Sequence, residues 1–191
     1  MESILKIDRQ LLLLMNFDGG AVTDSIFWFA SGKAVWIPLY ILIIWLMQRK
    51  IGWRRTLLAV VLIALAVVLS DQIANIFKHC TPKFRPTHTD AIKEYVHTVN
   101  GYRGGLYGTV SAHAATTFSI AAISAYTIRN RLYTIAIALW VLFVSYSRIY
   151  LGVHFPLDIL FGMITGAAVS AAAILLYEYA TRKFASVFRH S

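Results

Sequence analysis

The 191-residue chain is 58% hydrophobic and only 14% charged, and its 18 lysines and arginines against 9 aspartates and glutamates give a formal net charge of +9. Soluble domains are about 45–50% apolar and about 25% charged, so this composition excludes a disordered chain and argues against a cytosolic enzyme. In so apolar a chain, the basic balance favours a membrane surface over nucleic acid as the partner of the cations. Cys80 is the single cysteine and has no partner for an internal disulfide.

Residues 1–20 are predicted to contain an amphipathic helix that lies in the membrane interface. The apolar stretch at residues 4–15 includes Lys6, Asp8 and Arg9 and is too short to cross about 30 Å of hydrocarbon. Its charges lie inside the apolar stretch and no small-residue cleavage site follows, so it does not resemble a signal peptide.

Five later stretches reach or approach the roughly 20 apolar residues that a transmembrane helix needs. In chain order they are residues 26–47, which Lys33 interrupts, 56–77, 112–128, 132–150 and 156–180. The third is short and rich in Ala, Ser and Thr, which favours packing against other helices; Gly162 and Gly166 in the last form a small-xxx-small packing pair. The predicted fold is therefore all-α, a single domain (residues 1–191) built as an integral-membrane bundle of five to six transmembrane helices with an N-terminal amphipathic helix.

The segment 78–110 is the one sizeable loop and contains two prolines and four glycines. Long loops in compact domains tend to be functional. Within it, residues 90–99 are predicted to form one or two amphipathic turns whose apolar side carries Ile92, Tyr95, Val96 and Val99.

The distribution of cations predicts the orientation in the membrane. Nine cations fall at the turn after the first stretch, at the turn between the third and fourth, and in the C-terminal tail: Arg49, Lys50, Arg54, Arg55, Arg129, Arg131, Arg182, Lys183 and Arg189. The opposite side also has nine, but these sit beside acids or in the long loop, where the bias has less force. The loop is thus predicted to be extracytoplasmic, in a multi-pass protein of a bacterial inner membrane.

Polar residues gather on this predicted outer side. Asp71, Asn75 and Lys78 follow one another at i, i+4 and i+7, on one helix face. Arg85 precedes Pro86, which biases it toward an extended backbone. Ionisable residues at membrane depth are usually functional, but a snorkelling lysine and an interfacial arginine explain this segment equally well.

Ser111 and His113 stand at the start of the stretch 112–128. A helix N-terminus offers free N–H groups and a positive dipole end, which together bind phosphate, and the Ser111 hydroxyl could donate to the same oxygens. A structural histidine is the alternative.

The third cluster is Ser147 and Arg148, followed by His154 and Asp158. On a helix, the i, i+4 spacing of His154 and Asp158 lets the carboxylate hold one imidazole nitrogen and leaves the other free to attack a substrate.

Together, the runs Lys78, six residues, Arg85-Pro86; Ser111-Ala112-His113; and Ser147-Arg148, five residues, His154, three residues, Asp158 resemble the three signature motifs of the type 2 phosphatidic acid phosphatase superfamily. The resemblance implies a metal-independent, cofactor-free membrane phosphatase with a helical-bundle fold. It implies catalytic roles for His154 as a nucleophile that forms a phosphohistidine, Asp158 as its partner and His113 as acid and base. It implies substrate binding by the cations Lys78, Arg85 and Arg148, with Ser111, Ala112 and Ser147 contributing donors.

Two features depart from the family pattern. The middle motif usually reads Pro-Ser-Gly-His, and here Val110 and Ala112 replace the proline and glycine. Alanine keeps the backbone N–H but forbids the freest glycine geometries. The family's core also commonly has six helices, whereas five stretches are predicted here.

The predicted function is hydrolysis of a phosphate monoester or pyrophosphate on an envelope lipid. Undecaprenyl pyrophosphate, lipid A, phosphatidylglycerophosphate and phosphatidic acid are all candidate substrates, and Lys83, Lys93 and Arg103 are candidates for selecting the head group. The alternatives are a vanadate-dependent haloperoxidase, which shares the site but is soluble, and a catalytically silent membrane protein or transporter. No nucleic-acid partner and no metal are expected, and the sequence leaves the oligomeric state open.

Overall fold

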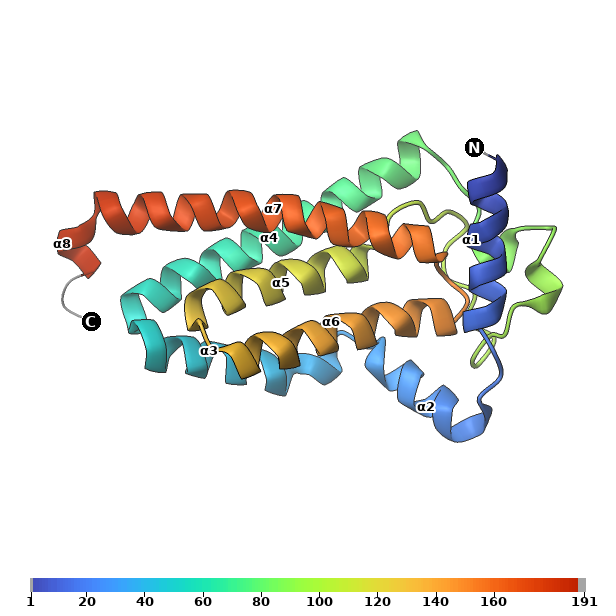
Figure 1. Cartoon of the computed structure of the whole chain (residues 1–191), viewed down its shortest axis with the longest axis horizontal. Helices are drawn as coiled ribbons and strands as arrows, with labels where there is room; N and C mark the ends of the chain where they lie inside the picture. Colours follow the sequence, from blue (N-terminus) through green and yellow to red (C-terminus); the bar gives the residue numbers. More distant parts are fainter. Residues whose placement is uncertain (1, 189–191) are drawn as a thin grey trace.

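The computed structural model describes residues 2–188, which form an all-α integral-membrane bundle (Figure 1). Its helices are α1 (Glu2–Met15), α2 (Gly20–Ala30), α3 (Ile37–Ile51), α4 (Trp53–Cys80), α5 (Ala112–Ile128), α6 (Arg131–Tyr150), α7 (Pro156–Lys183) and α8 (Ala185–Phe188). Within this part of the chain, the remaining regular structure is three short 3-10 turns, Ala34–Trp36, Pro86–His88 and Lys93–Tyr95, and one antiparallel bridge between Phe84 and Tyr107.

Three segments of the described residues are long and apolar enough to cross a membrane. They are Ala34–Cys80, Arg131–Tyr150 and Pro156–Lys183. The first comprises α3 and α4, which are separated by a turn at Gly52, whose φ of 74° lies in the left-handed region. The predicted stretches therefore lie where helices form, and the number of five to six transmembrane helices stays a prediction.

The predicted span over residues 26–47 is divided between two helices. α2 ends at Ala30, and α3 begins only at Ile37. Pro38 lies in the first turn of α3, where its missing N–H costs nothing, and the Trp36 indole N–H donates to the free carbonyl of Ala30 at 2.9 Å. The break lets α2 turn away from the bundle axis (Figure 1).

The short helix α5 lies at the centre of the bundle, where it packs against α3, α4, α6 and α7. Its contact with α7 depends on two glycines. A Cβ atom on Gly162 would lie 2.5 Å from the Ser111 carbonyl oxygen, and one on Gly166 would lie 2.5 Å from the Ala115 carbonyl oxygen. The predicted packing role of this pair is thus confirmed, because only glycine permits so close an approach.

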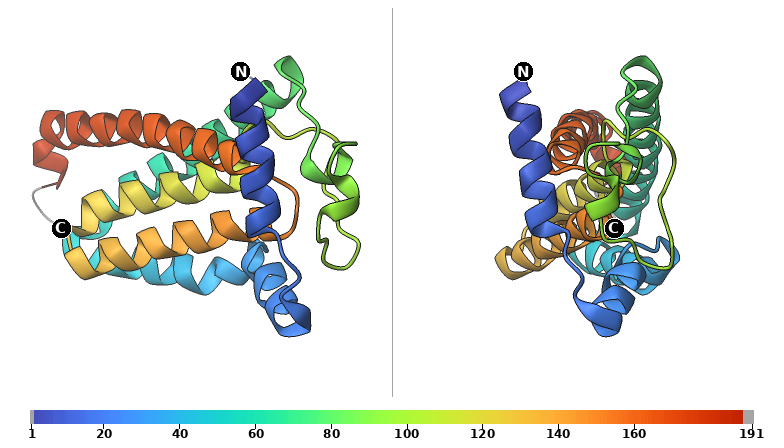
Figure 2. Two further views of the ribbon diagram at one scale, coloured as in Figure 1. Left: turned by 45° about the vertical axis from the view of Figure 1, so that its right-hand side comes forward. Right: turned by 90° about the vertical axis from the view of Figure 1, so that its right-hand side faces the viewer.

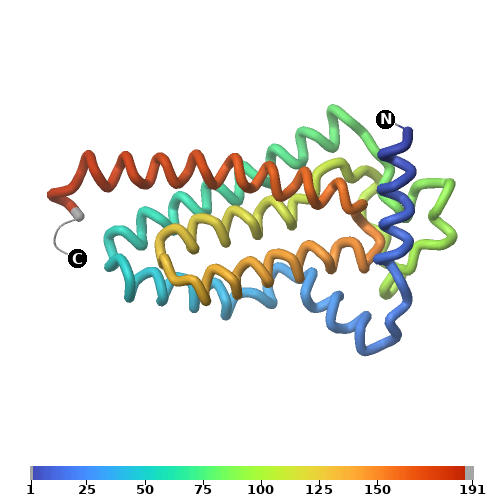
Figure 3. Tube along the Cα trace, in the orientation of Figure 1, coloured from blue at the N-terminus to red at the C-terminus, as the bar shows by residue number. Residues whose placement is uncertain are grey.

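One end of the bundle is covered by α1 and by the long loop. α1 runs across the ends of the bundle helices rather than along them, and α1 and α8 lie at opposite ends of the molecule (Figure 3). The segment after α4 lies over the same end, as both views in Figure 2 show. In that loop, Ile92, Val96 and Val99 are buried as predicted, whereas Tyr95 is 76% exposed.

The other end of the bundle gathers the turns predicted to be cytoplasmic. The α3–α4 turn, the α5–α6 turn and the end of α7 lie together there (Figure 1). Eight of the nine cations assigned to this side belong to these segments, and Arg189 lies outside the described residues.

Candidate active site

His154 and Asp158 form the predicted pair at the start of α7. His154 Nδ1 lies 3.4 Å from Asp158 Oδ2, and that same oxygen accepts the Phe155 N–H at 2.9 Å, which caps α7. Both side chains are almost completely buried, with exposed fractions of 3% and 1%. Since Nδ1 is held by the carboxylate, Nε2 is the nitrogen left for chemistry.

Arg85 lies in the loop and lines the same cavity as His154. Its backbone is extended, with φ −65° and ψ 159°, as its position before Pro86 predicts. Its guanidinium donates to the carbonyl oxygens of Tyr107 (3.0 Å) and Val153 (2.9 Å). Burial is the main cause that lowers the pKa of Arg85, and the nearby Arg148 is the second. The ordinary pKa of an arginine is so high that the side chain still stays charged.

Arg148, near the end of α6, is the second buried cation. It is 4% exposed, and one guanidinium nitrogen lies 3.4 Å from the Tyr102 hydroxyl. Its Nε is buried and has no hydrogen-bond partner among the described residues. A buried guanidinium nitrogen left without an acceptor is costly, so this atom is available to an anionic ligand.

Lys78 ends the polar face predicted on α4. Its Nζ donates to Asn75 Oδ1 at 3.1 Å, and Asn75 Nδ2 donates to Asp71 Oδ2 at 3.1 Å. The three residues predicted to share a face are thus joined in one chain of hydrogen bonds that fixes the lysine.

His113 faces the same region from the first turn of α5. One ring nitrogen, Nε2, lies 3.2 Å from the Ser31 carbonyl oxygen in the break between α2 and α3. The histidine is therefore oriented by a segment that lies within the predicted span 26–47.

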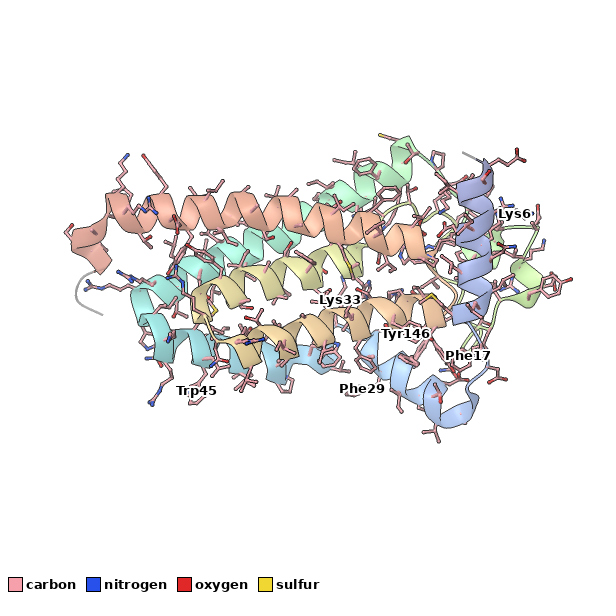
Figure 4. The ribbon with its side chains drawn as sticks, viewed as in Figure 1. Lys6, Phe17, Phe29, Lys33, Trp45 and Tyr146 are labelled. Atoms are coloured by element: carbon pink, nitrogen blue, oxygen red, sulfur yellow. The ribbon has the colours of Figure 1, made fainter. Side chains whose placement is uncertain are left out.

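These side chains surround one cavity of about 210 Å³. It is lined by Lys33, Asp71, Lys78, Arg85, Tyr102, Ala112, His113, Thr116, Arg148 and His154. Six of the predicted site residues thus meet at one cavity. Lys33, which lies in the α2–α3 break (Figure 4), and Tyr102 were not predicted to belong to the site.

Ser111, Ser147 and Asp158 stand behind the cavity rather than in its lining. Ser111 Oγ accepts the Ala114 N–H at 3.4 Å as the N-cap of α5, and Ser147 Oγ donates to the Val144 carbonyl oxygen at 2.6 Å. The direct donation from these serines to phosphate stays a prediction, and so does the action of Asp158 through His154.

The electrostatic character of the cavity determines the state of His154. Burial, followed by the charges of Arg85 and Arg148, lowers the pKa of His154 well below the ordinary value of 6.5. The imidazole is therefore neutral at physiological pH, which leaves a lone pair on Nε2. A neutral imidazole beside fixed cations suits attack on an anionic group.

An apolar groove of about 540 Å³ continues from this polar cavity. The two share Lys33, Asp71, His113 and Thr116. The groove runs between α3 and α4 and is lined there mainly by Tyr40, Ile43, Ile44, Val60, Ile63, Ala64, Val67 and Val68. A polar chamber that opens into such a groove accommodates a molecule with a charged head and an apolar tail.

One group of metal-ligand-type side chains occurs among residues 2–188, away from this cavity. It comprises Asp18, Asp24 and His97. His97 Nε2 and the Tyr150 hydroxyl both bond to Asp24 Oδ1, at 2.9 and 2.6 Å. These bonds satisfy the Asp24 carboxylate and tie α2 and the loop to the end of α6.

Comparison with known proteins places this geometry in a family. The model of the PAP2 superfamily matches residues 55–182. The chain is 36% identical over 185 residues to a lipid A 4′-phosphatase of Porphyromonas gingivalis, covering 96% of this chain and 78% of the relative. It is also 36% identical over 168 residues to a lipid A 4′-phosphatase of Bacteroides thetaiotaomicron, covering 87% and 75%.

A solved structure agrees in fold. A transmembrane PAP2-type phosphatidylglycerolphosphate phosphatase of Bacillus subtilis superposes with a TM-score of 0.68 at 15% identity, covering 94% of this chain and 88% of that one. The chain therefore belongs to the PAP2 superfamily of phosphatases. It is an integral-membrane lipid phosphatase, as the sequence predicted.

Proposed function

We propose that the protein removes a phosphate monoester from a lipid A-type saccharolipid through a phosphohistidine on His154. The observation that carries the proposal is the buried His154–Asp158 pair beside two buried guanidinium groups, with His113 lining the same cavity. The apolar groove that joins this cavity supports an amphiphilic substrate. The two relatives named lipid A 4′-phosphatases support the choice of lipid.

In the first half of the reaction, His154 Nε2 attacks phosphorus and the phosphorus–oxygen bond to the sugar breaks. The electron pair passes to the leaving oxygen, which takes a proton from protonated His113. Lys78, Arg85 and Arg148 hold the phosphoryl oxygens and offset their charge, since phosphoryl transfer depends mainly on positioning and electrostatics.

In the second half, His113 takes a proton from water while the water oxygen attacks phosphorus. The phosphorus–nitrogen bond breaks, its electron pair returns to His154, and inorganic phosphate leaves. The three cations neutralise the phosphoryl charge throughout, so we infer that the reaction needs no divalent ion.

The proposal predicts a specific activity pattern for the purified protein in detergent. Phosphate release is measured with lipid A, undecaprenyl pyrophosphate, phosphatidylglycerophosphate and phosphatidic acid, each in excess EDTA. We expect phosphate release to be fastest with lipid A and to persist in EDTA. We expect the variants His154→Ala and His113→Ala to lose phosphate release while they keep the thermal unfolding transition of the wild type.

These measurements test the proposed substrate and the proposed mechanism independently. A clear preference for another lipid contradicts the substrate proposal alone. Full turnover by either histidine variant, or an absolute requirement for a divalent ion, contradicts the mechanism. Halide oxidation with added vanadate and no phosphate release would support the haloperoxidase alternative.

We further propose that the site faces the outside of a bacterial inner membrane. The clustering of basic turns at the opposite end of the bundle supports this orientation, since such residues favour the cytoplasm. Cys80, which is exposed at the site end, is a native probe. An impermeant maleimide should label it in cells with an opened outer membrane, and protection until the inner membrane is lysed would contradict the orientation.

A further inference from the structure

Lys83 bridges two buried carboxylates behind the catalytic cavity. Its Nζ lies 2.9 Å from Asp158 Oδ1 and 3.1 Å from Asp8 Oδ2. Both acidic side chains are 1% exposed, and the lysine side chain is 28% exposed. The ammonium also lies 4.2 Å from the centre of the Phe155 ring, beside the backbone that leads into α7.

Asp8 brings the N-terminal helix into this arrangement. Its second oxygen, Oδ1, accepts the Leu157 N–H at 2.9 Å, so a side chain of α1 caps a free N–H in the first turn of α7. Leu12, four residues later on the same face of α1, is fully buried against a cluster that includes Phe155 and Ile159. That apolar contact fixes the position of Asp8.

The catalytic histidine is at the far end of the same chain of contacts. Asp158 Oδ1 receives Lys83, while Asp158 Oδ2 faces His154 Nδ1. Lys83 and Asp8 are not among the residues that line the catalytic cavity. The expectation that Lys83 selects the lipid head group therefore does not fit its position.

Charge balance gives the bridge a physical role. Two carboxylates that lie within reach of one ammonium repel each other, and each is expensive to bury unless it is paired and hydrogen-bonded. Without the cation, Asp158 would either take up a proton or turn away from Asp8. Either change loosens its hold on the imidazole.

We propose that Lys83 and Asp8 are positioning residues for the nucleophile, which makes α1 a part of the catalytic apparatus. The inference rests on the proposed role of His154. Asp8 holds Lys83 and the first turn of α7, Lys83 fixes the Asp158 carboxylate, and Asp158 orients the imidazole toward phosphorus. The bridge contributes to the rate of phosphoryl transfer and not to the binding of substrate.

The test uses variants that remove charge with little loss of packing. Lys83→Met keeps the aliphatic stem, Asp8→Asn keeps an oxygen for the Leu157 N–H, and Lys83→Arg keeps the charge. The matched control is the exposed ion pair Asp90–Lys93 in the same loop, whose Nζ–Oδ1 distance is 2.7 Å. It is removed by Asp90→Asn, which leaves Lys93 in place.

We expect Lys83→Met and Asp8→Asn to lower kcat roughly 10- to 100-fold, the range typical of lost outer partners of a functional histidine, with KM nearly unchanged. Lys83→Arg should restore most of kcat. The double variant should be no slower than the slower single variant, because both act through one chain of contacts. The control variant Asp90→Asn should match the wild type in kcat and KM.

Three results would overturn the inference. These are a wild-type kcat in Lys83→Met and Asp8→Asn, a rise in KM with unchanged kcat, and fully multiplicative losses in the double variant. If Lys83→Met fails to fold, the kcat of Lys83→Arg and Asp8→Asn decides. Absence of a phosphohistidine in the wild type would contradict the proposed mechanism, whereas equally fast formation in wild type and Lys83→Met would contradict the bridge alone.

Discussion

The buried position of His154 determines its protonation state, and its proposed role as a nucleophile requires the neutral imidazole. In the folded protein, burial and the neighbouring arginines keep the imidazole neutral, and on unfolding its pKa returns toward the ordinary value of 6.5. Below pH 6.5, His154 binds a proton in the unfolded chain but stays unprotonated in the folded protein. The side chain therefore favours folding fully above about pH 6.5, and this contribution is lost as the pH falls toward the folded pKa.

A comparison with His154→Gln isolates this effect, since glutamine does not titrate. Both proteins are compared between about pH 7.5 and about pH 5. Below about pH 6.5, the free energy of unfolding of the wild type should fall by up to ~1.4 kcal/mol per pH unit more than that of the variant. Thermal unfolding in detergent at a series of pH values measures it. Parallel decreases of Tm in the two proteins would show that the pKa of His154 is the same in the folded and the unfolded protein.

At this scale, the sequence predicts residues that carry a recurrent spacing and misses those that only the fold brings near. Lys78, Arg85, His113, Arg148 and His154 all line the cavity as predicted. Asp8 lies 150 residues from Asp158, and no spacing rule connects them. The one available signal was that the Asp8 carboxylate shares a helical face with Leu12. A carboxylate on an apolar face is unusual unless a cation pairs with it.

At the scale of elements, the positions of the later helices follow from hydropathy, whereas the break between α2 and α3 does not. Residues on both sides of the break are apolar, so hydropathy averaged over a window of residues does not reveal it. Gly32 and Pro38 were the local signals against a continuous helix. The break matters for function because it places Ser31 against His113 and Lys33 in the cavity lining.

The contact between α5 and α7 sets the distance between the two proposed catalytic histidines. His113 lies in the first turn of α5, and His154 lies just before α7. Gly162 and Gly166 determine how closely these helices approach. A larger residue at either glycine must push the helices apart.

Gly166→Val should therefore destabilise the protein by about 1–3 kcal/mol, the usual cost of forcing extra methyl groups into a packed contact. Tm in detergent measures the loss. The matched control is Gly105→Ala, because no atom lies within 4 Å of a Cβ at Gly105 and its φ is not positive. Equal Tm values for the two variants and the wild type would contradict the packing role.

At the scale of the whole molecule, the surplus of cations divides between the two ends of the bundle. One end carries the basic turns and the C-terminal part of α7, while the other contains the cavity with Lys78, Arg85 and Arg148. Composition alone predicts a basic membrane protein. The separation into a topological group and a phosphate-binding group appears only when the helices are placed in space.

His154 is proposed to carry the phosphoryl group during turnover, and one experiment tests this role directly. Purified protein in detergent is mixed with a lipid substrate labelled in its phosphate, quenched within milliseconds in alkali and mapped by mass spectrometry. We expect an acid-labile label on His154 that appears before inorganic phosphate and is absent from His154→Ala. Release of phosphate at the wild-type rate with no label on His154 would contradict it.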